Sequence, residues 1–342
     1  MAGRSCNVDF LIWSRTCAPF LGLDNNPLSF YPIAMNEFNT IVIPHLKMLF
    51  QEAFEQVRPW GDPTSWSCVF RLDLTHRTHL FVKGTPRTRT EALVTERLAS
   101  HCPPFAPPVL IPDLLPTTSW RWFVLEDVGE SQETVLTPSQ AFMVARALGT
   151  LQRCTENDSV LSNLLTDCSA DQIFPRLLTV CFWALQAEQR LSWRDELYHL
   201  TNEIEKAHSF FDDLAATLAE VPASIIHGDL WSGNLVLTET STCFLDWGDA
   251  LWGIGGTSLA HLLRSSSLPE QHTPLLWDAY QQGRDLHISQ AYHDACTIAL
   301  DVVDLVIDQA IASSSGQGPE QLKGLRPGLQ RISFHVQGRG AI

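Results

Sequence analysis

The sequence predicts an α+β chain of two lobes, a small β-rich lobe followed by a mainly helical one. Segments typical of strands cluster within residues 68–125, whereas helix-like segments follow one another across residues 138–312. The chain of 342 residues is longer than one average domain, and its 45% hydrophobic content is enough for a substantial core. These observations favour two lobes over a single compact unit.

The first lobe is predicted from three strand-like segments and one helix. Cys68 to Leu74 and His79 to Lys83 are expected to be neighbouring strands, and Trp120 to Leu125 a third. Thr90 precedes a helical run to Ser100. Residues 126–129, which are acidic and end in glycine, suit a linker, so we expect a lobe boundary after residue 129.

The second lobe is expected to be mainly helical. Helical segments are predicted at residues 138–153, 173–190, 194–220, 257–264, 273–282 and 289–312, and short strands at 235–237 and 243–245. The domain plan is therefore a leader of unclear role at 1–57, an N-lobe at 58–129, a helical C-lobe at 130–312 and a polar C-terminal tail at 313–342.

Charge and cysteine content restrict the class of protein. A net charge of −15 would repel a phosphate backbone, so we expect no nucleic-acid partner. The nine cysteines show no zinc-like spacing and are expected to be free thiols in the cytoplasm. No export signal is visible, and the aspartates within the apolar window 295–311 argue against a membrane span. No obligate protein partner is inferred.

One loop concentrates the chemistry. In residues 225–235, Asp229 and Asn234 lie five positions apart between apolar residues, and Asp246 follows a short strand. Carboxylate and amide oxygens are suited to Mg²⁺. Phosphoryl transfer needs such a set, because it depends on positioning and on neutralisation of charge. The alternative is a capped turn for Asp229 and Asn234, with a strand-end cap at Asp246.

The order His227-Gly228-Asp229, Asn234 and Leu245-Asp246-Trp247 resembles the aminoglycoside phosphotransferase and choline kinase family of small-molecule kinases. This resemblance covers residues 58–312 and implies a protein-kinase-like fold that uses ATP and Mg²⁺. It makes Asp229 the catalytic base, Asn234 and Asp246 the magnesium ligands, and Lys83 the residue that neutralises the nucleotide phosphates. Protein kinases usually carry Arg where this chain has Gly228.

The same resemblance suggests further nucleotide-binding residues. A helix glutamate should hold Lys83, and the spacing favours Glu91 over Glu96. Residues 60–67 occupy the place of the phosphate-covering loop but hold one glycine, so the hydroxyls of Ser65 and Ser67 would have to help. Residues 123–128 resemble the hinge that meets the adenine, which places Glu126 and Val128 at the base.

A stripe of four aspartates, at 294, 301, 304 and 308, lies on one face of the predicted helix 289–312. The stripe must face water or a cleft, because the rest of the helix is apolar. A solvated stripe is one interpretation. The other is that Asp301 and Asp304 bind a cationic acceptor, such as an amino alcohol or an aminoglycoside-like compound.

Three functions remain open at this stage. The leading one is an ATP-dependent phosphotransferase acting on a hydroxyl of a small molecule. The others are a kinase for a protein or polymer, and a catalytically silent nucleotide-binding scaffold. The sequence does not identify the acceptor, the preference between ATP and GTP, or the oligomeric state.

Ser258, where the family often has Asp, is expected to alter only a structural cap.

Overall fold

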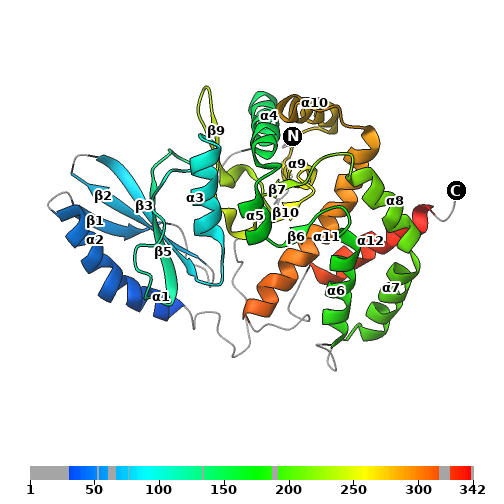
Figure 1. Cartoon of the computed structure of the whole chain (residues 1–342), viewed down its shortest axis with the longest axis horizontal. Helices are drawn as coiled ribbons and strands as arrows, with labels where there is room; N and C mark the ends of the chain where they lie inside the picture. The colour runs from blue at the N-terminus through cyan, green and yellow to red at the C-terminus, as the bar shows by residue number, and fades with distance from the viewer. Residues whose placement is uncertain are drawn as a thin grey trace, which may run out of the picture.

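The computed structural model describes residues 31–51, 54–60, 67–75, 77–132, 135–186, 192–315 and 324–339. Figure 1 shows two lobes side by side, with the strands of a sheet on one side and most of the helices on the other. The predicted α+β architecture of a β-rich N-lobe and a mainly helical C-lobe is confirmed.

The N-lobe contains a five-stranded sheet in the order β1-β2-β3-β5-β4, in which all neighbours are antiparallel. Its strands are β1 (Phe54–Pro59), β2 (Cys68–Leu74), β3 (Arg77–Pro86), β4 (Val109–Ile111) and β5 (Trp120–Glu126). Val69 on β2 and Phe123 on β5 are the cross-strand partners of Lys83. Lys83 therefore lies on a central strand with a fixed register.

Helices cover both faces of this sheet (Figure 1). Helices α1 (Tyr31–Glu37) and α2 (Ile43–Phe50), joined by a π-helical turn (Phe38–Val42), pack on one face, and α3 (Glu91–His101) lies on the other. The ring of Phe38 stacks on Phe70 with centroids 3.5 Å apart. The domain plan began the N-lobe at residue 58, whereas side chains between Ala34 and Phe50 pack in the lobe's core and residues 54–59 form an edge strand of its sheet. Residues 1–30 of the expected leader lie outside the described ranges.

Nine helices are described in the C-lobe, together with five short strands. The helices are α4 (Pro138–Thr155), α5 (Ser159–Leu164), α6 (Ile173–Gln186), α7 (Arg194–Lys206), α8 (His208–Leu218), α9 (Gly256–Ser265), α10 (Thr273–Arg284), α11 (Gln290–Ser315) and α12 (Leu325–Arg339). The strands are β6 (Asp167–Cys168), β7 (Ser224–Ile226), β8 (Leu235–Leu237), β9 (Thr242–Phe244) and β10 (Leu251–Gly253). The predicted helix 194–220 is in fact two helices that meet at Ala207.

The C-terminal segment also differs from the domain plan. Residues 313–342 were expected to form a polar tail, but α11 continues to Ser315 and α12 packs against α11 and α7. Leu325, Leu329 and Ile332 on α12 are fully buried, and their spacing places them on one helix face. This apolar face makes α12 part of the C-lobe core.

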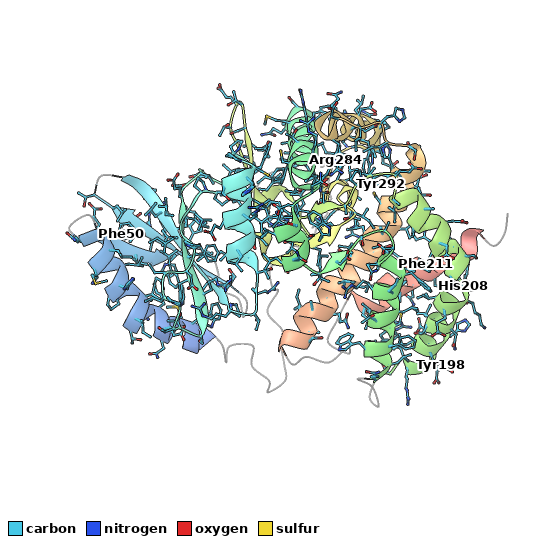
Figure 2. All side chains as sticks on the ribbon, viewed as in Figure 1. Phe50, Tyr198, His208, Phe211, Arg284 and Tyr292 are labelled. Atoms are coloured by element: carbon cyan, nitrogen blue, oxygen red, sulfur yellow. The ribbon has the colours of Figure 1, made fainter. Side chains whose placement is uncertain are left out.

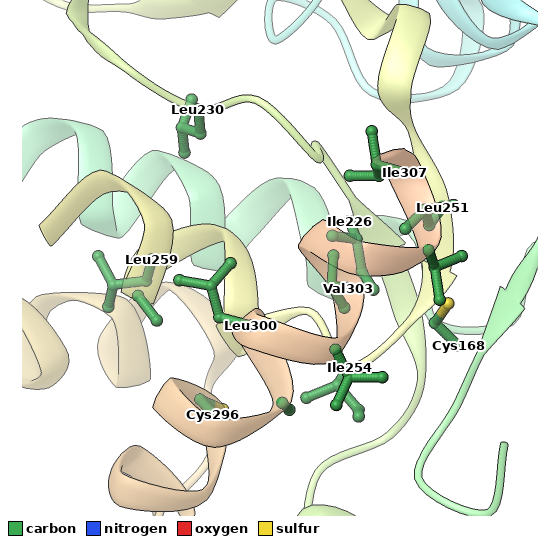
Figure 3. Close-up of a cluster of buried hydrophobic side chains, with 14 of the residues drawn as sticks. Cys168, Ile226, Leu230, Leu251, Ile254, Leu259, Cys296, Leu300, Val303 and Ile307 are labelled. Carbon is green, nitrogen blue, oxygen red and sulfur yellow. The ribbon is translucent and has the colours of Figure 1, made fainter. Parts of the chain in front are cut away.

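Helix α11 runs through the centre of that core. Figure 3 shows Leu300, Val303 and Ile307 of α11 among buried side chains from β7, β10 and α9, including Ile226. The strand that leads into the candidate catalytic loop therefore rests on a buried helix. Among the described residues, no helix is both long and apolar enough to span a membrane.

Candidate active site

The candidate catalytic loop follows β7 and ends in a short 3-10 turn, Ser232–Asn234. Gly228 has a φ of +80°, and a Cβ at this position would lie 2.0 Å from the carbonyl oxygen of Asp249. Glycine is required here for both the left-handed backbone and the close approach of the two chain segments. This turn brings Asp229 to the end of the strand.

Asp229 and Asn234 are joined within the loop. The side-chain nitrogen of Asn234 donates to the backbone oxygen of Asp229 at 2.8 Å and approaches its carboxylate at 3.3 Å. Because the nitrogen is held in this way, the Asn234 side-chain oxygen is the atom left to serve as a metal ligand. The structure brings together the two loop residues that the sequence predicted.

Asp246 follows β9 and has a left-handed backbone, with φ 59° and ψ 70°. Its Oδ1 accepts a hydrogen bond from Lys83 Nζ at 3.1 Å, although the two residues are 163 positions apart. The surrounding protein would raise the pKa of Asp246, but the charge and hydrogen bond of Lys83 outweigh this and hold the pKa below its ordinary value. The side chain is 49% exposed, so the carboxylate can also contact a ligand.

Lys83 and Glu91 form a buried ion pair at 2.5 Å. Of the two candidate glutamates, the structure therefore pairs Glu91 with Lys83. Burial would lower the pKa of Lys83, but Asp246 and Glu91 more than offset it and raise the pKa, so the ammonium stays charged. Burial raises the pKa of Glu91 to about 7, against the lowering effect of Lys83. This pair fixes the Lys83 side chain between the lobes.

His227 connects the loop to the segment that follows β9 and contains Asp246. The fully buried ring donates from Nε2 to the carbonyl oxygen of Leu245 at 2.8 Å. Burial lowers its pKa to about 4, so the ring is neutral. Its backbone N–H donates to the hydroxyl of Ser258 at 3.0 Å. Ser258, the serine that departs from the family pattern, thus anchors the candidate catalytic loop directly.

The sequence of residues 66–295, more than half of the chain, matches the sequence model described as the phosphotransferase enzyme family. The chain belongs to the phosphotransferase enzyme family. Among curated proteins, no sequence matches this member of the family.

Solved structures share the fold of this phosphotransferase family member. Choline kinase LicA from Streptococcus pneumoniae is 14% identical with a TM-score of 0.59, and the match covers 88% of this chain and 99% of the kinase. Macrolide 2'-phosphotransferase MphH from Brachybacterium faecium is 13% identical with a TM-score of 0.57, over 88% and 98% of the two chains. Amicoumacin kinase hAmiN, solved with AMP-PNP, Ca²⁺ and Ami, is 12% identical with a TM-score of 0.57, over 90% and 96%. The predicted protein-kinase-like fold is confirmed.

The remaining nucleotide-binding predictions are only partly located. Ser65 lies outside the described residues, and Ser67 is partly buried just before β2. Glu126 ends β5, and its N–H donates to Pro108 at 3.0 Å, so this donor is already used within the lobe. Val128 lies two residues further along the linker. A nucleotide role for these residues stays a prediction.

Sequence reasoning assigned no individual role to two aromatic residues near Lys83, Phe81 and Trp60. Phe81 precedes Lys83 by two residues on β3, so both side chains lie on one face. Trp60 packs edge-on against Phe81 with centroids 5.5 Å apart, and the Arg71 guanidinium lies 5.5 Å from the Trp60 ring centre. The alternation along β3 was the signal that could have identified Phe81.

The predicted cation pocket at Asp301 and Asp304 is not open. The two residues are 4% and 5% exposed, so the expectation that both face water or a cleft is wrong. Asp301 Oδ1 accepts from Arg331 Nε at 2.9 Å and from Arg264 Nη1 at 3.3 Å, and Asp304 pairs with Arg264. Arginines from α9 and α12 thus neutralise these carboxylates within the chain. A substrate role for the two aspartates stays a prediction that these contacts do not support.

Proposed function

We propose that this chain transfers the γ-phosphate of ATP to a hydroxyl group of a small molecule, with Mg²⁺ as the required ion. One observation carries the proposal: the N-lobe ammonium of Lys83 lies 3.1 Å from the C-lobe carboxylate of Asp246. The backbone N–H of Leu245, the residue before Asp246, donates to the Asn234 carbonyl oxygen at 2.9 Å. Residues from both lobes therefore meet beside the loop that holds Asp229.

The residues present fit a magnesium ion that also binds a nucleotide. Among the described residues there is no cluster of three or more His, Cys, Asp or Glu side chains suited to a metal. Mg²⁺ in kinases is commonly held by one or two protein ligands together with phosphate oxygens and water. The half-exposed carboxylate of Asp246 and the oriented side-chain oxygen of Asn234 match that requirement. When bound, the ion would neutralise charge that develops on the phosphate oxygens.

The protein's own groups divide the remaining work. Asp229 would accept or orient the proton of the acceptor hydroxyl, which general-base catalysis requires within hydrogen-bonding distance. Lys83, held charged by Glu91 and Asp246, would contact the phosphates as a fixed cation. Asn234 would keep the Asp229 carboxylate in one orientation through its side-chain nitrogen. Little covalent chemistry is left for the protein, because the reaction depends on positioning and charge.

Two other functions have less support. A silent scaffold would tolerate loss of Lys83, Glu91 or Asp246, yet these side chains are held in one ion-paired cluster. A protein kinase is disfavoured because protein kinases usually carry Arg at the position of Gly228, and here the Asp249 carbonyl oxygen leaves no room for a side chain.

The cysteines within the described ranges are free thiols, which supports placing the activity in the reducing cytoplasm.

A small-molecule acceptor is proposed on two grounds. The structures that share the fold are named for choline, a macrolide and amicoumacin. The net charge of −15 would raise the local concentration of cationic compounds, so amino alcohols and aminoglycoside-like compounds are the first acceptors to test.

The test is ADP release from Mg-ATP with a panel of hydroxylated amines, sugars and antibiotics. Wild type should release ADP in an acceptor-dependent way, and Asp229→Ala should lower kcat by roughly 10³-fold or more because the base and its positioning are lost. The control is Asp213→Ala, an exposed aspartate on α8, which should behave as wild type. Equal turnover by Asp229→Ala and wild type would reject the assignment, and ATP binding without turnover on any acceptor would favour the scaffold.

A further inference from the structure

Strand β7, which leads directly into the catalytic loop, is an edge strand. The small sheet has the order β6-β10-β7, so β7 has a strand neighbour on one side only. Ile225 pairs with Trp252 of β10. On the side away from β10, the backbone N–H and carbonyl oxygen of Ile225 must find partners outside the sheet. The side chains of α4 supply them. The Ile225 carbonyl oxygen accepts from Gln152 Nε2 at 2.9 Å, and its N–H donates to the Thr155 hydroxyl at 3.4 Å.

Gln152 also joins β7 to the start of α9. The same Nε2 donates to the carbonyl oxygen of Gly255 at 2.9 Å, so one amide holds two backbone carbonyls. Gln152 is fully buried, and its oxygen accepts from the Tyr280 hydroxyl of α10 at 2.5 Å. Because that oxygen has a donor partner, the side-chain nitrogen is fixed toward the two carbonyls. Tyr280 therefore sets the orientation of the amide.

Helix α10 can reach this position because it crosses α4 at two glycines. A Cβ on Gly149 would lie 2.3 Å from the Tyr280 carbonyl, and one on Gly283 would lie 2.1 Å from the Arg146 carbonyl. The close crossing brings a second residue of α10 to the same strand, the fully buried Arg284 labelled in Figure 2. Arg284 donates to the Ser224 hydroxyl and to the Pro222 carbonyl oxygen, both at 2.9 Å.

Helix α9 carries the connection from this network to Asp229. The Ser258 hydroxyl accepts from the His227 N–H, two residues before Asp229. The His261 ring is 2.9 Å from the carbonyl oxygen of Leu230, the residue after it. Both sides of the candidate base are thus held by α9, whose first residues are tied to β7 through Gln152.

We infer that Gln152 and Tyr280 are positioning residues of the phosphotransferase: their bonds hold β7 and α9 in the one arrangement that places Asp229 beside the reacting hydroxyl. This inference rests on the proposed function. It assigns a kinetic role to α10, none of whose residues touches the candidate base in the contacts described above. Displacement of a reacting group by about 1 Å can cost roughly 100-fold in rate, so a small shift of this loop would be measurable.

The experiment compares Tyr280→Phe, Gln152→Met and Gln152→Glu with wild type. Tyr280→Phe removes only the hydroxyl, whereas Gln152→Glu keeps the acceptor for Tyr280 and loses the N–H donors to both carbonyls. Each variant should lower kcat by roughly 10- to 100-fold at temperatures well below its Tm, with KM and Kd for Mg-ATP within about twofold of wild type. Tyr292→Phe is the matched control, because Tyr292 is also fully buried but lies on α11, and its hydroxyl forms no hydrogen bond with Gln152 or Tyr280.

A second measurement does not depend on turnover. Amide hydrogen exchange in residues 225–231 should become faster in Tyr280→Phe and stay unchanged in Tyr292→Phe. If Tyr280→Phe keeps wild-type kcat and exchange, or loses only Tm, the residue is merely structural and the inference is overturned. If wild type transfers no phosphate to any acceptor, the proposed function fails, and the exchange comparison still decides whether α10 positions the loop.

Discussion

Replacement of Asp301 by Asn separates a structural carboxylate from a substrate-binding one. The Asp301 carboxylate is buried, and its Oδ1 accepts from Arg331 Nε at 2.9 Å and from Arg264 Nη1 at 3.3 Å. Asn conserves the volume and one acceptor oxygen but removes the charge. The contacts link α11 to α9 and α12, so we expect the variant to lose stability rather than affinity for an acceptor.

The size of the loss follows from exposure. Hydrogen bonds to a charged group contribute about 1.5–3 kcal/mol each, and breaking a fully buried ion pair costs about 3–5 kcal/mol. The side chains of Arg264 and Arg331 are 42% and 49% exposed, so both guanidinium groups can regain water when the carboxylate is removed. We therefore expect a loss of about 2 kcal/mol, or about 3 °C in Tm for a chain of 342 residues with an unfolding entropy of about 2.1 cal/mol/K per residue.

The assay is thermal unfolding of wild type, Asp301→Asn, Arg331→Gln and the double variant. The double variant should lose less than the sum of the single losses, with a coupling energy of about 1 kcal/mol. Asp294→Asn is the control on the same helix, because Asp294 is exposed and bonds only to Gln290 among the contacts described. This variant should change the free energy of unfolding by no more than about 0.5 kcal/mol. An unchanged Tm together with a salt-sensitive rise in KM for a cationic acceptor would refute this reasoning and restore the cation pocket.

Three further predictions concern the candidate catalytic loop and its surroundings. Asp246→Ala should weaken ATP binding in the presence of Mg²⁺ and leave metal-free ATP binding almost unchanged. Titration calorimetry with and without Mg²⁺ checks this. If ATP binding by the variant keeps its full dependence on Mg²⁺, Asp246 is excluded as a ligand. Gly228→Ala should lower the free energy of unfolding by about 1–2 kcal/mol because of its φ of +80°, with a further loss from contact with Asp249. A Tm and a kcat equal to those of wild type would contradict the requirement for glycine in this turn. The pKa of His227 falls from 6.5 to about 4 on folding, so its contribution to stability is complete above pH 6.5 and is lost as pH falls toward 4, by up to about 3 kcal/mol. His227→Gln should flatten the unfolding free energy over that pH range, and an unaltered profile would show that another group titrates.

Much of the candidate site could be predicted because its chemistry is local in sequence. Asp229 and Asn234 lie within one loop, and their spacing determines that they can meet through the contact at 2.8 Å. Asp246 lies two residues after β9, the second strand after this loop, so it belongs to the same short stretch of chain. The alternation of β2 and β3 also determined the face on which Lys83 lies. Short-range geometry leaves few alternatives for such residues.

The surroundings of the site were decided by contacts between distant segments. Periodicity shows which face of a helix is buried, but it does not show against what. The sequence therefore predicted the stripe that contains Asp301, and only the tertiary structure supplied Arg264 and Arg331 as its partners. In the same way, the sequence alone gives Gln152 no special role. The fold places it beside the edge strand β7, where the carbonyl oxygen of Ile225, 73 positions away, needs a hydrogen-bond donor.

The sequence by itself determined the fold class and the candidate catalytic residues, because strand alternation, helical period and loop spacing act over a few residues. Tertiary structure decided the limits of the lobes and the roles of buried polar groups. Helices α1 and α12 became parts of the two cores because each could bury an apolar face against elements far away in the chain. A buried charge or amide must likewise find its partner wherever the fold brings one within reach, since leaving it unpaired costs more than most single contacts contribute.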